Sequence, residues 1–225
     1  SMDSLLSMIR ELAAEGIEIE HLDLGGGMVV TYQDETEFDV AAYGAAIAQS
    51  LGGFAPAGRP LKVMLEPGRF LVAGGGVLLA RVEYLKPATE PDGRSFAVVD
   101  AAMNDLIRPA LYQAWHRVET VLDGTTAAHS SRETWDIVGP ICESGDFLAK
   151  DRALALAPGE LLAIHSAGAY GMVQSSNYNS RGRAAEVLVN GDQFSVVRRR
   201  ETIRDQLASE LEGLESAVHN ATRRS

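Results

Sequence analysis

The chain has 225 residues, of which 46% are hydrophobic and 23% are charged, and its formal net charge is −11. This composition is typical of one ordinary globular domain or two small ones, and the negative balance argues against nucleic acid or an anionic membrane as a partner. The single cysteine excludes an internal disulfide and fits the reducing cytoplasm. We therefore expect a cytoplasmic protein in which local arginines meet any anionic ligand.

The first 80 residues alternate between helical and strand-like patterns. We expect a helix, a strand, a second helix and a second strand, at residues 3–15, 17–24, 38–53 and 61–69. Because a long crossover joins the two strands, they should be parallel. Two such units cannot form a parallel sheet that is buried on both faces, so residues 1–80 are predicted to be the end of a larger α/β structure.

The pattern changes near residue 81, where short apolar runs are separated by turn-rich loops. A hairpin is expected around Asn190-Gly191, and a helix is expected at residues 201–214. We predict a mostly antiparallel β barrel or sandwich over residues 81–212, followed by a tail at 213–225. The apolar runs predicted to be strands are residues 77–87, 95–100, 134–140 and 160–168.

Two loops, Gly25–Gly27 and Glu66–Arg69, follow the two predicted parallel strands. The backbone N–H groups of glycines can approach an anion, although a plain turn is the simpler interpretation of the triplet alone. Loops at the ends of the last two strands of a TIM barrel frequently bind phosphate. Glu66 could pair with a protonated pyridine nitrogen. The alternative is a surface ion pair with Arg69, which would contribute about 0–1 kcal/mol.

Three further stretches carry candidate site residues. Arg108 lies four residues before Tyr112, and the pair could hold a carboxylate, although Arg108 could also be a surface residue. Cys142 ends an apolar strand in a polar loop beside Glu143, which favours a thiol that acts as an acid or base over an inert buried one. Tyr170 is flanked by small residues and is therefore free to direct its hydroxyl at a ligand.

Two other sets of polar residues are interpreted as structural. Residues 177–179, Asn-Tyr-Asn, are interpreted as turn chemistry. His21, His116 and His165 lack metal-ligand spacing with another histidine or with the cysteine, so no metal site is predicted.

Five motifs occur in a fixed order: "LDLGGG", "EPGRFL", "MNDLIRPALY", "CESGD" and "GAYG…SSNYNSR", with "RRRETI" near the end. Together they resemble the C-terminal half of the diaminopimelate decarboxylases, which are pyridoxal-phosphate (PLP) enzymes with an alanine-racemase-like barrel and a C-terminal β domain. The resemblance covers nearly all of residues 18–212. It implies the last βα units of a TIM-type barrel, and the decarboxylation of meso-2,6-diaminopimelate to L-lysine in lysine biosynthesis. A related PLP decarboxylase for another amino acid, or a non-catalytic dimerisation or regulatory module, remain the alternatives.

The resemblance also implies roles for the matching residues. Cys142 is the proton donor, and it reaches with Glu143 into the active site of the partner subunit, which implies a homodimer with shared sites. The residues implied to hold PLP are Gly26, Gly27, Glu66, Gly68, Arg69 and Tyr170. The residues implied to bind the amino-acid substrate are Arg69, Arg108, Tyr112, Glu143 and Tyr170.

The lysine that binds PLP in this family lies in the N-terminal half of the enzyme, for which the chain shows no counterpart. The chain has three lysines, Lys62, Lys86 and Lys150. Lys62 starts the strand that ends near Glu66, so it should lie at the opposite end from the site. Lys86 lies in the link to the β domain, and Lys150 matches no family motif. We therefore expect the chain to be a piece of a longer polypeptide that lacks normal decarboxylase activity in isolation.

Overall fold

The structure, a computed structural model, describes residues 2–56, 58–121 and 132–214. It divides into a unit that ends at Val72 and a unit that begins at Ala73. No described helix is long and apolar enough to cross a membrane. Most of the predicted tail, residues 213–225, lies outside the described residues.

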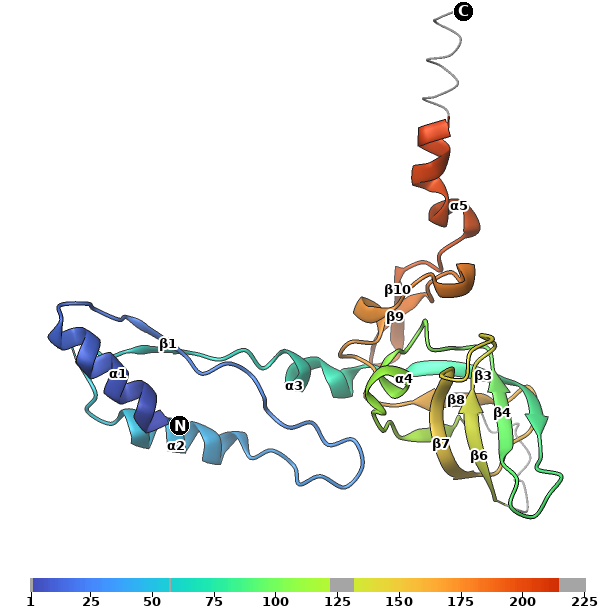
Figure 1. Cartoon of the computed structure of the whole chain (residues 1–225), viewed down its shortest axis with the longest axis horizontal. Coiled ribbons are helices and arrows are strands. Elements are labelled where there is room, and N and C mark those ends of the chain that lie inside the picture. Colours follow the sequence, from blue (N-terminus) through green and yellow to red (C-terminus); the bar gives the residue numbers. More distant parts are fainter. Residues whose placement is uncertain (1, 57, 122–131, 215–225) are drawn as a thin grey trace, which may run out of the picture. The chain divides into compact units, whose positions relative to one another are not determined.

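The N-terminal unit contains two longer helices and a pair of short strands (Figure 1). Leu6 and Ile9 of the first helix are buried in one cluster with Leu22 of the first strand, which is the apolar stripe that the helical spacing predicts. The two strands are parallel, as predicted. In chain order the elements are α1 Met2–Ala14, β1 His21–Asp23, α2 Val40–Leu51, β2 Lys62–Met64 and α3 Gly68–Val72.

Both strands of this unit are shorter than the sequence pattern predicts. β2 ends at Met64, and a short helix, α3, follows from Gly68 where the pattern suggested a continuous strand. Pro67 explains the change, because its fixed φ and missing N–H end a strand ladder and are tolerated in the first turn of a helix. The Phe38 ring then packs against Tyr43 of α2, at 5.3 Å between ring centroids, and against Phe70 of α3, at 5.7 Å.

In the C-terminal unit, six strands form one curved sheet in the order β5-β8-β3-β4-β6-β7. Its end strands β5 and β7 contact each other, so the sheet is a nearly closed barrel (Figure 1). Every neighbouring pair is antiparallel except β4 and β6, which confirms the mostly antiparallel prediction. The strands are β3 Leu78–Lys86, β4 Ser95–Val99, β5 Val118–Thr120, β6 Glu133–Val138, β7 Phe147–Leu154 and β8 Leu161–Ile164.

The barrel interior is filled by β-branched and leucine side chains, and Val82, Val99 and Ile137 are fully buried there. His116 is also fully buried. Its Nδ1 lies 2.8 Å from the carbonyl oxygen of His165, and a carbonyl can only accept, so Nδ1 carries the proton. Burial lowers the pKa of His116, so this ring is a neutral structural group.

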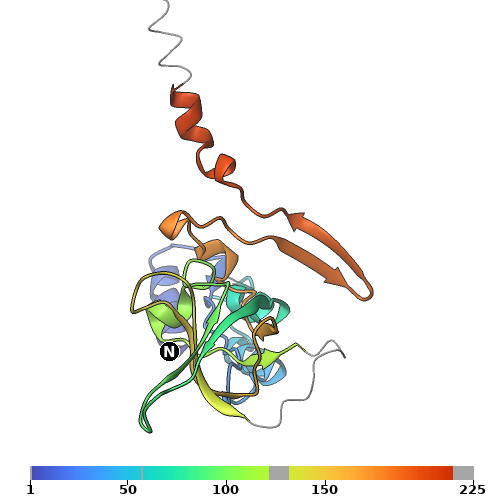
Figure 2. The ribbon, with the colours of Figure 1, turned by 90° about the vertical axis from the view of Figure 1, so that its right-hand side faces the viewer.

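A hairpin and a helix follow the barrel. The strands β9 Glu186–Asn190 and β10 Gln193–Arg198 form a two-stranded sheet of their own (Figure 2). Their connection turns at Gly191, whose φ is +63°, so the predicted hairpin is confirmed. The helix α5 Ile203–Gln206 starts with a capping box between Thr202 and Asp205. A turn at Leu207 interrupts it before helical residues resume at 208–214.

Candidate active site

The two loops after the parallel strands lie against each other in the N-terminal unit. The N–H of Glu66 donates to the carbonyl oxygen of Gly25 (2.8 Å). A Cβ on Gly26 would lie only 2.4 Å from the carbonyl oxygen of Glu66, so only glycine fits there. Gly25 and Gly27 have φ values of +70° and +81°, in the left-handed region that favours glycine. The adjacency expected from parallel strands is therefore present.

These loops place hydrogen-bond donors, the backbone N–H groups of glycines, beside an acceptor, the carboxylate of Glu66. Gly26 and Gly27 have no side chains to shield their N–H groups, and the Glu66 carboxylate beside them is exposed. No ion pair joins Glu66 to Arg69 in the part of the chain that the structure describes. Backbone N–H groups suit a phosphate, and a carboxylate suits a protonated ring nitrogen, so this donor set fits PLP.

In the C-terminal unit, Arg108 lies beside Tyr170. Arg108 and Tyr112 occupy the two ends of the short helix α4 Arg108–Tyr112. Arg108 is only 8% exposed, so it is not the surface residue of the alternative interpretation, and its guanidinium carbon lies 5.5 Å from the centroid of the Tyr170 ring. Tyr170 has a φ of +64°, an uncommon conformation for a residue other than glycine. Tyr112 is exposed.

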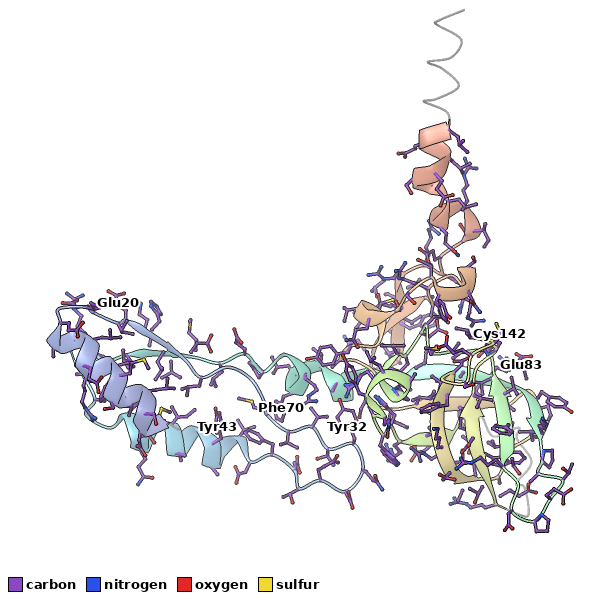
Figure 3. The ribbon with its side chains drawn as sticks, in the orientation of Figure 1. Glu20, Tyr32, Tyr43, Phe70, Glu83 and Cys142 are labelled. Atoms are coloured by element: carbon purple, nitrogen blue, oxygen red, sulfur yellow. The ribbon has the colours of Figure 1, made fainter. Side chains whose placement is uncertain are left out.

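Cys142 is exposed in the loop between β6 and β7 (Figure 3). The buried carboxylate of Asp146 fixes this loop: one oxygen accepts from the N–H of Met103 and the other from the N–H of Ile141, both at 2.7 Å. A Cβ on Gly139 would lie 2.5 Å from the same carboxylate. The "CESGD" loop is therefore tied to the "MNDLIRP" segment by a residue that the sequence analysis did not single out.

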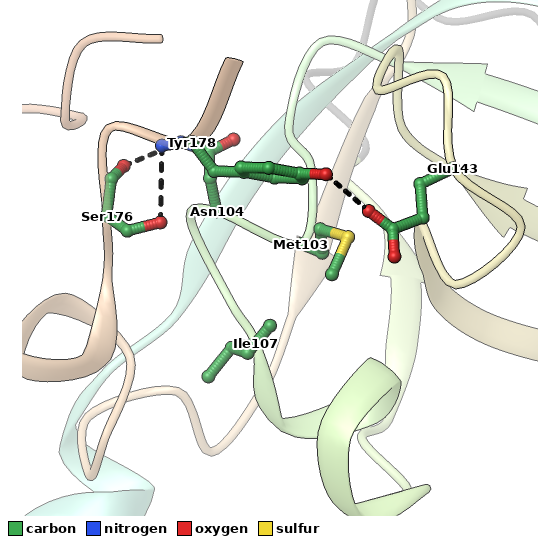
Figure 4. Close-up of a pocket in the computed structure, with 6 residues that line it drawn as sticks. All are labelled: Met103, Asn104, Ile107, Glu143, Ser176 and Tyr178. Atoms are coloured by element: carbon green, nitrogen blue, oxygen red, sulfur yellow. Dashed lines mark hydrogen bonds between the residues drawn. The ribbon is translucent and has the colours of Figure 1, made fainter. Parts of the chain in front are cut away.

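A pocket of about 530 Å³ lies beside the "CESGD" loop, and Figure 4 shows the residues that line it. The hydroxyl of Tyr178 donates to Oε2 of Glu143 (2.7 Å), and Nδ2 of Asn179 lies 3.8 Å from Sγ of Cys142. The hydrogen bond and negative charge of Glu143 raise the pKa of the Tyr178 phenol. Residues that line the pocket are Met103, Asn104, Ile107, Glu143, Ser176 and Tyr178.

Comparison with known proteins assigns both units. The pyridoxal binding domain model of the pyridoxal-dependent decarboxylases matches residues 1–73, and their C-terminal sheet domain model matches residues 58–168. The chain is 57% identical over 210 residues to diaminopimelate decarboxylase of Pseudomonas fluorescens, covering 93% of this chain and 48% of the relative. The chain belongs to the pyridoxal-dependent decarboxylase family.

Other members of the decarboxylase family show the same coverage. The diaminopimelate decarboxylase of Neisseria meningitidis is 51% identical over 97% of this chain and 50% of the relative. The structure of the Helicobacter pylori enzyme complexed with L-lysine has a TM-score of 0.82 and 36% identity, covering 94% of this chain and 50% of that chain. The chain thus spans about half the length of these relatives. A lysine/ornithine decarboxylase from Vibrio vulnificus, 22% identical with a TM-score of 0.68, shares the fold.

The structure brings candidate residues together within each unit. In the N-terminal unit, the Gly25–Gly27 loop is hydrogen-bonded to the loop that contains Glu66. In the C-terminal unit, the Arg108 guanidinium lies over the Tyr170 ring. Cys142 and Glu143 meet Asn179 and Tyr178, which the sequence analysis interpreted as turn chemistry alone. Their place in the "GAYG…SSNYNSR" motif was the feature of the sequence that could have indicated a functional role for Tyr178 and Asn179. No group of three or more metal-ligand side chains is present among the described residues.

Proposed function

We propose that this chain forms the C-terminal part of a PLP-dependent enzyme that converts meso-2,6-diaminopimelate to L-lysine and carbon dioxide. The observation that carries the proposal is the 57% identity to a diaminopimelate decarboxylase over 210 residues. Contacts between side chains of the candidate motifs, Tyr178 with Glu143 and Arg108 with Tyr170, support it. The Helicobacter pylori relative, crystallised with L-lysine, supports the assignment of L-lysine as product.

In this proposal the N-terminal unit holds the cofactor. The N–H groups at Gly26 and Gly27 bind the phosphate. Gly68 and Arg69 lie in the turn after Glu66, where the N–H of Gly68 donates to the carbonyl oxygen of Glu66 (2.9 Å). The Glu66 carboxylate keeps a proton on the ring nitrogen. When bound, PLP supplies an electron sink for the electron pair left behind as carbon dioxide departs.

The far end of the substrate distinguishes diaminopimelate from other amino acids, because it carries a second carboxylate and a second ammonium. We assign the carboxylate to Arg108, propose Arg69, Tyr112 and Tyr170 as further substrate-binding residues, and assign the ammonium to Glu143. A substrate without the distal carboxylate would leave a mostly buried arginine without its ligand, a mismatch that gives strong discrimination.

We assign proton delivery to Cys142. The bond between the α-carbon and its carboxylate breaks, and the thiol proton goes to the same carbon, forming a C–H bond. Exposure of Cys142 is consistent with a thiol that acts in the site of a partner subunit, and we propose a homodimer with shared sites. The PLP-binding lysine would come from a part of the barrel outside this chain, with residues 1–80 as the end of that barrel.

A chimaera tests this function. In it, this chain replaces the matching C-terminal half of the Pseudomonas fluorescens decarboxylase, to which it is 57% identical. We expect it to decarboxylate meso-diaminopimelate with a kcat/KM at least about a hundredfold above that for ornithine, arginine or lysine. Carbon dioxide release is measured for all four. Preference for another amino acid would instead support the neighbouring decarboxylase activity.

Replacing Gly26 with alanine is expected to weaken PLP binding by the chimaera about tenfold or more. The new Cβ would meet the carbonyl oxygen of Glu66 at 2.4 Å, and must therefore push the two loops apart. The matched control is Gly44→Ala in α2, where a Cβ meets nothing within 4 Å. PLP titration followed by absorbance gives both dissociation constants; equal values for the two variants would contradict the assigned cradle.

A further inference from the structure

The hydroxyl of Tyr178 contacts the residue to which the proposed function assigns the distal ammonium. It donates to Oε2 of Glu143 at 2.7 Å, across the rim of the pocket in Figure 4. Within the described residues, no hydrogen bond engages the other carboxylate oxygen, Oε1. One oxygen is thus fixed by the phenol, while the other can accept from an ammonium.

The segment that carries Tyr178 is held by Asn104, which is 2% exposed. The N–H of Ser176 donates to the carbonyl oxygen of Asn104 (2.9 Å), and the Asn104 side-chain amide donates to the carbonyl oxygen of Ser176 (3.2 Å). Nε of Arg181 donates to the side-chain oxygen of Asn104 (2.9 Å). Hydrogen bonds therefore hold the chain on both sides of Tyr178.

A second set of contacts holds the residue directly before Tyr178. The side-chain amide of Asn177 donates to Glu201 (2.5 Å) and to the carbonyl oxygen of Arg181 (3.0 Å), and its oxygen accepts from Arg183 (2.7 Å). Hydrogen bonds from the Arg183 backbone and from Asn177 lower the pKa of Glu201, which keeps this carboxylate charged. Because these hydrogen bonds already fix the segment, the Tyr178 hydroxyl loses little further conformational freedom when it binds Glu143.

The backbone beyond Tyr178 explains why two successive side chains face the same loop. Asn179 and Ser180 both have a φ of +56°, in the left-handed region. This conformation is uncommon for serine and persists only where the surroundings enforce it. With it, the Tyr178 hydroxyl reaches Glu143 while the Asn179 amide lies 3.8 Å from the sulfur of Cys142.

We propose that Tyr178 is a positioning residue that fixes the Glu143 carboxylate for the distal ammonium of the substrate. The inference rests on the proposed function and adds a residue to it. Tyr178 acts through Glu143, so its effect belongs to substrate binding, and the effect requires the Glu143 side chain.

Tyr178→Phe in the chimaera removes the hydroxyl and keeps the ring. We expect the KM for meso-diaminopimelate to rise about tenfold, because a hydrogen bond to a charged group is lost, with kcat within about threefold. Tyr84→Phe is the matched control, since Tyr84 is an exposed tyrosine of β3. In a Glu143→Ala background, Tyr178→Phe should change KM less than about twofold. An unchanged KM in an active chimaera, or the full tenfold change without Glu143, would overturn the inference.

A second measurement does not depend on activity. With tyrosines labelled at the ¹³Cζ atom, the Tyr178 resonance is assigned by its disappearance in Tyr178→Phe. Glu143→Ala should shift this resonance and leave that of Tyr84 in place. A Tyr178 resonance that ignores Glu143→Ala overturns the inference, whether or not the chimaera is active. An inactive chimaera whose Tyr178 resonance does respond places the failure in the proposed function and leaves the contact standing.

Discussion

Replacing Asp146 with alanine is expected to lower the free energy of unfolding of the C-terminal unit by about 3 kcal/mol. Its carboxylate is 4% exposed and accepts from the N–H groups of Met103 and Ile141, both at 2.7 Å. Alanine would leave these two donors without an acceptor in a poorly hydrated place, and each such group costs about 1–3 kcal/mol. Urea unfolding followed by fluorescence of the buried Trp135 measures the loss.

Two companion variants sharpen this measurement. Asp92→Ala removes an exposed carboxylate from a turn and should change stability by less than about 0.5 kcal/mol. Asp146→Asn keeps one side-chain oxygen as an acceptor and should fall between the parent and Asp146→Ala. If Asp146→Ala were as stable as Asp92→Ala, the carboxylate would not hold the "CESGD" loop.

Replacing Cys142 with alanine is expected to lower kcat of the chimaera by about 10²- to 10³-fold, with KM within about threefold. The side chain delivers a proton in our proposal and adds little to ground-state binding. Cys142 is exposed and is the one cysteine of the chain, so its loss leaves no cavity in a core and no other thiol to replace it. Steady-state kinetics with meso-diaminopimelate give both constants.

Ser144→Ala is the control for this substitution, because Ser144 is exposed in the same loop and has no assigned role. It should retain kcat within about twofold. A Cys142→Ala chimaera with the kcat of the Ser144→Ala chimaera would remove the thiol from the mechanism and leave proton delivery to another group.

Periodicity and turn residues were sufficient to predict most elements. The apolar spacing of Leu6 and Ile9 placed α1, and Asn190-Gly191 placed the β9–β10 hairpin. The crossover argument predicted the parallel pairing of β1 with β2, and hence the contact of the glycine loop with Glu66. These features follow from local chemistry and simple connection rules, so one sequence is enough to find them.

Contacts between distant segments could not be read in the same way. The parallel pair of β4 with β6 joins strands separated by more than thirty residues, and no spacing rule specifies that pairing. The sequence did not distinguish Asp146 from the other carboxylates near its loop. Its structural role depends on hydrogen bonds from Met103 and Ile141, which only the structure shows. Tyr178 was interpreted as part of a turn because its hydrogen bond to Glu143 joins segments 35 residues apart, which no local pattern indicates.

The most direct test of the central claim is incubation of the chimaera with meso-diaminopimelate in deuterium oxide. The product is examined by mass spectrometry, alongside the separately expressed N-terminal half of the Pseudomonas fluorescens enzyme. We predict L-lysine with one deuterium on the carbon that lost its carboxylate, formed only when this chain is present. A chimaera that binds PLP but makes no lysine would contradict the assignment of this chain to diaminopimelate decarboxylation.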